Sequence, residues 1–180
     1  MTCIIGLVDN DKVYIGGDSA GVSSYNISLR NDEKVFTKGD MVFGFTSSFR
    51  MGQLLRYKLK IPKQPIGIKD FEYLCGDFMD SVIKCFEDNK FATLNNNVIE
   101  GGVFLLGYKS KLYEVQSDFQ VSSVAGGFDS CGCGDNYAKG AMRILINDKK
   151  LKAEEKIIKA LEVAEYFSAG VSAPFNIVSV

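Results

Sequence analysis

The chain has 180 residues, of which 46% are hydrophobic, so it is long enough and apolar enough to form one domain with a sizeable core. Its 21 Lys and Arg residues almost balance its 22 Asp and Glu residues, and the net charge of -1 gives no electrostatic reason to expect nucleic acid or an anionic membrane as a partner. No apolar run is long enough to span a bilayer. We therefore expect a single domain over residues 1–180, with no nucleic-acid or membrane partner.

The five cysteines and the absence of histidine narrow the possible chemistry. An odd number of cysteines, behind an N-terminus without the basic region of a signal peptide, is typical of reduced thiols in a cytoplasmic protein. Cys131 and Cys133 have no second pair at zinc-ligand spacing, so we predict neither a metal nor another cofactor. Without histidine, Ser-His-Asp and Cys-His arrangements are excluded. A hydrolase made from this chain would need an amine, a carboxylate or a metal-bound water as its base.

The first half of the chain begins with predicted strands and continues with predicted helices. Asn10-Asp11 separates two apolar runs and is a turn signal, so a hairpin is expected there. Farther on, apolar residues recur at three- and four-residue steps, which predicts a helix with one apolar face. In chain order, the predicted elements are strands over 3–9, 12–17, 34–37 and 41–46, then helices over 49–60 and 69–87.

The second half repeats this arrangement of strands followed by helices. The predicted elements are strands over 99–108 (broken by Gly101-Gly102), 111–117 and 120–127, helices over 135–147 and 152–168, and a last strand over 175–180. Helices therefore come in pairs and strands come in runs, which excludes regular βαβ winding around a parallel sheet. The order predicts an α+β fold, in which mainly antiparallel sheets have their outer faces covered by helix pairs.

Thr2 is the first residue with a candidate chemical role. A small second residue is of the kind that normally allows Met1 to be removed, and removal would give Thr2 a hydroxyl and a free α-amine. An α-amine ordinarily has a pKa of about 7.7–8.0, so near neutral pH a good fraction can accept a proton. A threonine can be activated in this way without histidine. Taken alone, however, Thr2 is equally well interpreted as a solvated first residue.

Two further residues give Thr2 a context. Asp18 follows a strand and two glycines, and Lys34 begins the next predicted strand. Each would ordinarily be a turn residue or a surface charge. Their order and their distances from Thr2 resemble the proteasome β-subunit family and the bacterial peptidase of the two-component ATP-dependent protease. In that family the corresponding residues are the nucleophile, the acid that orients the lysine, and the lysine that lowers the proton affinity of the nucleophile.

The resemblance continues through the rest of the chain and implies four more site residues. The Ser47 amide would form the oxyanion hole, although this family usually has Gly at that position. Cys133 would replace a serine that assists the N-terminal amine. Glu165 would replace an Asp near the end of the last helix, and Ser168 matches the serine of that segment. The implied fold is a four-layer α-β-β-α sandwich, the N-terminal-nucleophile (Ntn) hydrolase fold.

The function implied by the resemblance is a threonine-type endopeptidase that works inside a homo-oligomeric ring on peptides or unfolded proteins. Any ATPase unfoldase would be a separate chain, because this sequence has no ATPase motif. Two alternatives stay open, since a fold does not fix a function. One is an amidase or acylase for small molecules. The other is a catalytically inactive structural ring subunit, which the departures at Ser47, Cys133 and Glu165 would fit.

Overall fold

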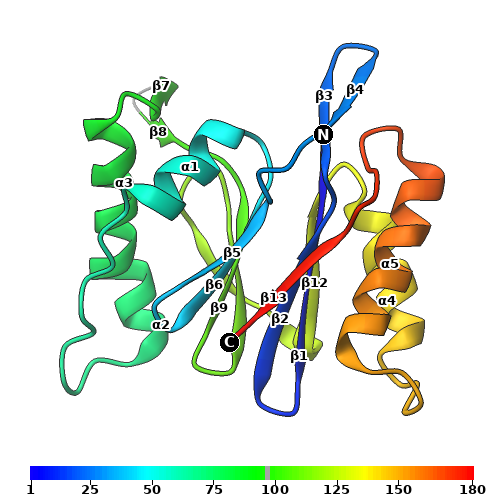
Figure 1. The fold of residues 1–180 in the computed structure, drawn as a ribbon. Coiled ribbons are helices and arrows are strands. Elements are labelled where there is room, and N and C mark those ends of the chain that lie inside the picture. Colours follow the sequence, from blue (N-terminus) through cyan, green and yellow to red (C-terminus); the bar gives the residue numbers. More distant parts are fainter. Residues whose placement is uncertain (96–97) are drawn as a thin grey trace.

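Two β-sheets lie face to face, and helices cover the outer side of each, so that the layers run α-β-β-α (Figure 1). This computed structural model describes residues 1–95 and 98–180. Over these residues the first sheet has the strand order β12 (Phe128–Gly132), β1 (Cys3–Asp9), β2 (Lys12–Gly17) and β13 (Asn176–Ser179). The second has the order β11 (Val121–Ser123), β10 (Lys111–Val115), β9 (Phe104–Tyr108), β6 (Met41–Phe45) and β5 (Val35–Lys38).

Strand pairing in the described residues is antiparallel throughout. The predicted hairpin at the N-terminus is present: Asp9 lies opposite Lys12, and both Asn10 and Asp11 have the positive φ that a two-residue turn requires. Two short hairpins stand outside the main sheets, β3 (Ala20–Ser23) with β4 (Asn26–Leu29) and β7 (Thr93–Asn95) with β8 (Val98–Glu100).

The helices form the two outer layers, as predicted. The second sheet is covered by α1 (Phe49–Tyr57), α2 (Asp70–Tyr73) and α3 (Met79–Asp88), and the first sheet by α4 (Asp135–Leu145) and α5 (Ala153–Phe167). None of the helices in the described ranges is long and apolar enough to cross a membrane. The predicted α+β class and its four layers are confirmed.

Alternation along β1 shows why its residues form a central strand. Ile4 points between the two sheets, whereas Cys3 and Ile5 pack on the other face against α4 and α5. All three side chains are fully buried. A strand that is apolar on both faces must have a layer on each side, so β1 fixes the start of the chain in the middle of the fold.

The predicted break at Gly101-Gly102 is present and separates β8 from β9. Two other predicted elements are interrupted, in both cases at glycine. The predicted helix over 69–87 contains a π-helical turn, Leu74–Phe78, in which Gly76 has non-helical dihedral angles. The predicted strand over 120–127 ends at Ser123, because Gly126 and Gly127 both have positive φ, and the strand β12 follows them. The segment from 128 to 132 was not predicted as a strand.

The β3–β4 hairpin was also missed. All residues of β4 are exposed, and the hairpin projects beyond both sheets (Figure 1). β4 therefore has no buried face that would impose the two-residue apolar alternation by which strands are recognised. The hairpin lies beside the N-terminus, since Val22 of β3 borders the same small cavity as Met1 and Thr2.

Candidate active site

Thr2 lies just before β1 and is only 4% exposed. Its carbonyl accepts a hydrogen bond from the Gly134 amide at 3.3 Å. Gly132 has φ +105°, and a Cβ there would come within 2.3 Å of the Thr2 carbonyl oxygen, so this close approach of two backbones requires glycine. With Met1 attached, the Thr2 hydroxyl donates to the Met1 carbonyl. The loop before α4 thus holds Thr2 in place from the side opposite β2.

A cavity of about 80 Å³ lies at Thr2. Lys34 borders the same cavity, just before β5, and so does Ser47, before α1. The fold therefore brings three of the predicted site residues together from separate parts of the chain.

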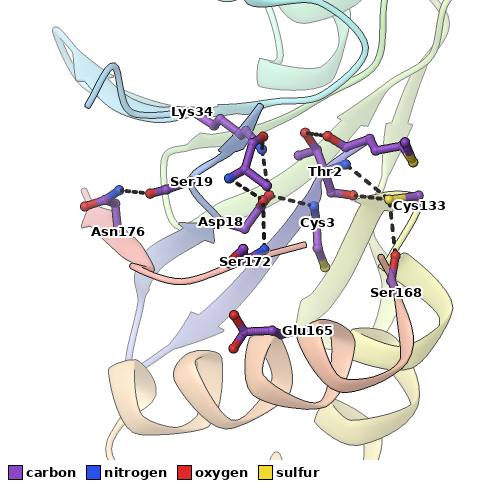
Figure 2. A network of polar contacts seen from close by, with 12 residues as sticks. Thr2, Cys3, Asp18, Ser19, Lys34, Cys133, Glu165, Ser168, Ser172 and Asn176 are labelled. Atoms are coloured by element: carbon purple, nitrogen blue, oxygen red, sulfur yellow. Dashed lines mark hydrogen bonds and ion pairs between the residues drawn. The ribbon is translucent and has the colours of Figure 1, made fainter. Parts of the chain in front are cut away.

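Lys34 forms a buried ion pair with Asp18 (Figure 2). Its Nζ donates to Asp18 Oδ1 at 2.8 Å and to the Ala20 carbonyl at 2.7 Å, while the two charged side chains are 1% and 0% exposed. Burial lowers the pKa of Lys34 below its usual value, and the nearby Asp18 carboxylate opposes that shift. An ion pair taken so far out of water is costly unless its other hydrogen-bonding positions are filled.

Backbone amides fill the remaining positions of the Asp18 carboxylate. Asp18 Oδ1 also accepts from the Cys3 amide at 2.9 Å, and Oδ2 accepts from the Ala20 amide at 2.9 Å and from the Ser172 amide at 3.4 Å. Cys3 is the neighbour of Thr2 in the chain, so the carboxylate joins β1, the start of β3 and the loop after α5. It thereby fixes Lys34 relative to Thr2.

Ser47 has a backbone conformation that favours glycine, with φ +68°. Its hydroxyl accepts a hydrogen bond from the Val103 amide at 3.2 Å, which helps to hold this turn. Among the described residues, the Ser47 N–H donates to no protein acceptor. A free amide at the border of the Thr2 cavity is available to an oxygen of a bound molecule.

Cys133 lies on the other side of Thr2, beside its main-chain nitrogen (Figure 2). The Thr2 N–H donates to Cys133 Sγ at 3.2 Å, and the Ser168 hydroxyl donates to the same sulfur at 3.3 Å. Cys133 is exposed, in contrast to Asp18 and Lys34. The structure therefore places Cys133 at the Thr2 nitrogen and Ser168 at the Cys133 sulfur.

Glu165 is the one predicted site residue that does not join this cluster. It lies on α5, below the other labelled side chains in Figure 2, and its Oε1 accepts from the Ala173 amide at 2.7 Å. Ala173 follows Ser172, whose amide donates to Asp18. Glu165 thus holds the loop after α5, which in turn contacts the ion pair.

The backbone partners of Asp18 and Lys34 were not predicted from the sequence. These are the Cys3, Ala20 and Ser172 groups, and a backbone contact leaves no signal in residue type. Ser19 was also missed: its hydroxyl donates to the Pro174 carbonyl at 2.6 Å and ties the same loop to the end of β2. Among residues 1–95 and 98–180, no group of three or more His, Cys, Asp or Glu side chains is arranged to hold a metal ion.

Comparisons with known proteins identify the fold of this chain and do not test the roles of its site residues. No protein-family model matches the chain, and no curated protein sequence matches it significantly. Solved structures do match. The structure of Thiobacillus denitrificans BPH in complex with epoxomicin aligns with a TM-score of 0.84 at 16% identity, over 99% of this chain and 98% of that one. A second structure of Thiobacillus denitrificans BPH aligns with a TM-score of 0.83 at 16% identity, over 99% of this chain and 97% of that one.

Eukaryotic HslV from Trypanosoma brucei is also similar, with a TM-score of 0.71 at 20% identity, over 99% of this chain and 98% of that chain. Both likenesses cover nearly the whole chain, and the arrangement of two antiparallel sheets between helices agrees with them. The sequence identities are too low to carry over an activity or a nucleophile. The chain has the proteasome β-type fold of the N-terminal-nucleophile hydrolases.

Proposed function

We propose that this chain is a threonine-type peptidase whose nucleophile is Thr2 after removal of Met1. The observation that carries the proposal is the buried Lys34–Asp18 ion pair at the cavity of Thr2. A hydrogen-bonded ion pair beside a cavity, with a lysine pKa shifted by burial, is typical of a functional site. Such an arrangement is costly to maintain.

Removal of Met1 has two chemical consequences. It frees the α-amine of Thr2, and it takes away the carbonyl to which the Thr2 hydroxyl donates. The hydroxyl then attacks the substrate carbonyl carbon, and its proton passes to the neutral α-amine, directly or through a water. The positive charge of Lys34 favours the developing alkoxide, and Asp18 keeps that charge in place.

The tetrahedral intermediate carries a negative charge on the former carbonyl oxygen, and the free Ser47 N–H would donate to it. Losing one donor of this kind typically costs about 2.7–4 kcal/mol of the barrier. Collapse of the intermediate breaks the amide bond, the leaving amine takes the proton held by the α-amine, and an ester on Thr2 remains. Water then hydrolyses the ester. Cys133 and Ser168 would orient the α-amine during both steps.

The assembly, substrates and location that we propose are inferred from the fold and from the proteins that share it. We propose a homo-oligomeric ring of single-domain subunits spanning residues 1–180, which cleaves peptides or unfolded proteins in the cytoplasm, with any ATPase supplied by another chain. The relative BPH has been solved with epoxomicin bound, so epoxomicin is a suitable probe for this chain too. A second candidate, an amidase for small amides, is favoured by the small volume of the Thr2 cavity.

Turnover by purified protein, shown by mass to lack Met1, tests the proposal. We expect the parent to cleave peptide substrates and Thr2→Ala to lose that activity. Thr37→Ala is the matched control, because Thr37 is an exposed threonine on β5, away from the cavity. Equal turnover by Thr2→Ala and the parent would contradict the assignment. Cleavage of small acylated amines without cleavage of unfolded proteins would favour the second candidate.

A further inference from the structure

Thr46 places a buried hydroxyl group at the candidate active site. The residue is 8% exposed and borders the cavity of about 80 Å³ at Thr2. It lies in the turn between β6 and α1, immediately before Ser47, which borders the same cavity. The hydroxyl is therefore placed among the groups that a molecule bound at Thr2 would meet.

The Thr46 hydroxyl has no hydrogen-bond partner in the part of the chain that the structure describes. The main chain of Thr46 is paired, since its N–H donates to the Val103 carbonyl at 3.1 Å and its carbonyl accepts from the Ser48 amide at 2.8 Å. No hydrogen bond of the side-chain oxygen accompanies these contacts over residues 1–95 and 98–180. Threonine hydroxyls ordinarily bond a nearby backbone group, and most buried polar groups are paired. A partner from outside the protein is therefore expected.

Water can reach the Thr46 hydroxyl. In the described residues, every side-chain nitrogen or oxygen that is sealed from solvent has a hydrogen-bond partner. Because the Thr46 oxygen has none, it must face open space, and the cavity that Thr46 borders is the one at Thr2. Its volume of about 80 Å³ exceeds the roughly 30 Å³ that a water molecule occupies in the liquid. The cavity therefore has room for an ordered water beside the hydroxyl.

Gly132 keeps the Thr46 hydroxyl close to Thr2. A Cβ at Gly132 would lie 3.2 Å from Thr46 Oγ1 and 2.3 Å from the Thr2 carbonyl oxygen, so both atoms lie beside the same point. Loss of Met1 frees the Thr2 hydroxyl from the Met1 carbonyl and creates the α-amine. A water in the cavity then has the α-amine, the Thr46 hydroxyl and the Ser47 N–H at its border, which meets the two to four polar partners that a bound water needs.

We propose that Thr46 is a positioning residue, which holds the water that hydrolyses the ester on Thr2. This proposal rests on the proposed function. The water oxygen attacks the ester carbonyl carbon while one of its protons passes to the neutral α-amine. The intermediate then breaks its bond to the Thr2 oxygen, which takes that proton back, and the acyl group leaves as a carboxylic acid. Thr46 Oγ1 accepts a hydrogen bond from the second O–H of the water and thereby orients the attack.

The test compares Thr46→Val with the parent, both without Met1, because valine keeps the branched shape and removes the hydroxyl. A peptide ester with a good leaving group acylates Thr2 rapidly, so its kcat reports the hydrolysis step, whereas kcat/KM for the matching peptide amide reports acylation. We expect kcat for the ester to fall by about two- to tenfold, the factor that one neutral hydrogen bond is worth. The value of kcat/KM for the amide should fall less, because Thr46 acts on the second step.

Intact mass measured during ester turnover gives a second readout, since a larger share of Thr46→Val than of the parent should carry the acyl group. Thr46→Ser keeps a hydroxyl and should restore the rate of the parent. Thr37→Val is the matched control, because Thr37 is exposed on β5 and does not border the Thr2 cavity, and it should behave as the parent. Thr46→Ala serves as a second variant if Thr46→Val does not fold. Equal losses in the ester and amide reactions would overturn the proposal.

A crystal structure of the Met1-free protein tests the bound water without turnover. We expect an ordered water within hydrogen-bond distance of Thr46 Oγ1 in the parent and its loss in Thr46→Val. A parent without that water would overturn the role of Thr46. So would a folded Thr46→Val that hydrolyses the ester as fast as the parent, and that result would leave the proposed function intact. A parent that forms no ester on Thr2 would contradict the proposed function and, with it, the hydrolytic role of this water.

Discussion

The two sides of Thr2 differ in burial and in the kind of contact they make. On one side, Asp18 and Lys34 are at most 1% exposed, and nitrogen donors meet oxygen acceptors at 2.7 to 3.4 Å. On the other side, Cys133 is exposed and its contacts to Thr2 and Ser168 run through sulfur. The buried side tolerates little change, because each lost contact leaves a charge or an amide without a partner. The exposed side can accept a different residue at smaller cost.

Breaking the buried ion pair should have the largest effect. Asp18→Ala leaves the Lys34 ammonium in the interior without its counter-charge, and removal of one partner of a buried pair typically costs about 3–5 kcal/mol. We expect that loss in the free energy of unfolding, measured by urea denaturation, together with loss of turnover. Asp88→Ala is the control, since the Lys84–Asp88 pair is exposed, and it should cost less than about 1 kcal/mol. A similar loss of free energy of unfolding in Asp18→Ala and Asp88→Ala would contradict the greater importance of the buried ion pair.

The pH dependence of turnover should distinguish the two sides in a single experiment. The α-amine of Met1-free Thr2 must be neutral, so kcat/KM should rise as pH increases through the pKa of that amine. Lys34 must be charged, and burial lowers its pKa, so activity should fall at a pH below that expected for an ordinary lysine. Below the pKa of the amine and above the pKa of Lys34, kcat/KM should change by about tenfold per pH unit. A profile with no alkaline fall below about pH 10.4 would contradict the role of Lys34.

The lowered pKa of Lys34 also predicts how the stability of the fold depends on pH. The pKa of Lys34 is lower in the folded protein than in the unfolded chain, so the unfolded chain binds more protons between those two pKa values. This group should therefore raise the free energy of unfolding as pH increases through that window. Urea denaturation of the parent and of Lys34→Met over that range measures the difference, and an identical pH slope for both proteins would contradict it.

Glu165 should have an intermediate effect, through the loop that supports the buried side. Glu165→Ala removes a charge-assisted hydrogen bond to the Ala173 amide, of a kind worth about 1.5–3 kcal/mol. We expect a lower free energy of unfolding and reduced turnover, with partial rescue by Glu165→Gln, whose side-chain oxygen can still accept. Glu162→Ala, an exposed change on the same helix, is the control. No difference between Glu165→Ala and this control would contradict the role of the loop.

Cys133 should have the smallest effect. Cys133→Ser gives the Thr2 nitrogen a hydroxyl, a better hydrogen-bond partner than a thiol, and a single neutral bond is worth about 0.5–1.5 kcal/mol. We expect a rise in turnover of at most about tenfold with little change in stability. Cys133→Ala should lower turnover instead. A collapse of activity in Cys133→Ser would show that the sulfur itself takes part in the chemistry.

The sequence predicted those elements that bury an apolar face. The strand over 3–9 and the helix from 152 have the periodic pattern that packing against a second layer imposes, and both are present. The exposed strand β4 has no such face, and its hairpin with β3 was missed. The strand β12 was missed because it begins immediately after two glycines with positive φ, where a sequence pattern indicates only a turn.

The same distinction applies to the candidate site. Side chains that must be charged, such as Asp18 and Lys34, are visible in the sequence as residue types at a spacing. The backbone groups that complete the hydrogen bonding of these side chains are not visible in the sequence. Glu165 was predicted by resemblance as a site residue near the end of the last helix, and in the structure it accepts a hydrogen bond from the Ala173 amide.

Intact-mass spectrometry after treatment with epoxomicin tests the central claim most directly. If Thr2 is the nucleophile, the purified protein will lack Met1 and gain one epoxomicin mass, peptide mapping will place the adduct on Thr2, and Thr2→Ala will gain none. Protein that keeps Met1 would contradict the account, because Thr2 would have no free amine. So would an adduct that persists in Thr2→Ala, or Met1-free protein whose Thr2 stays unmodified.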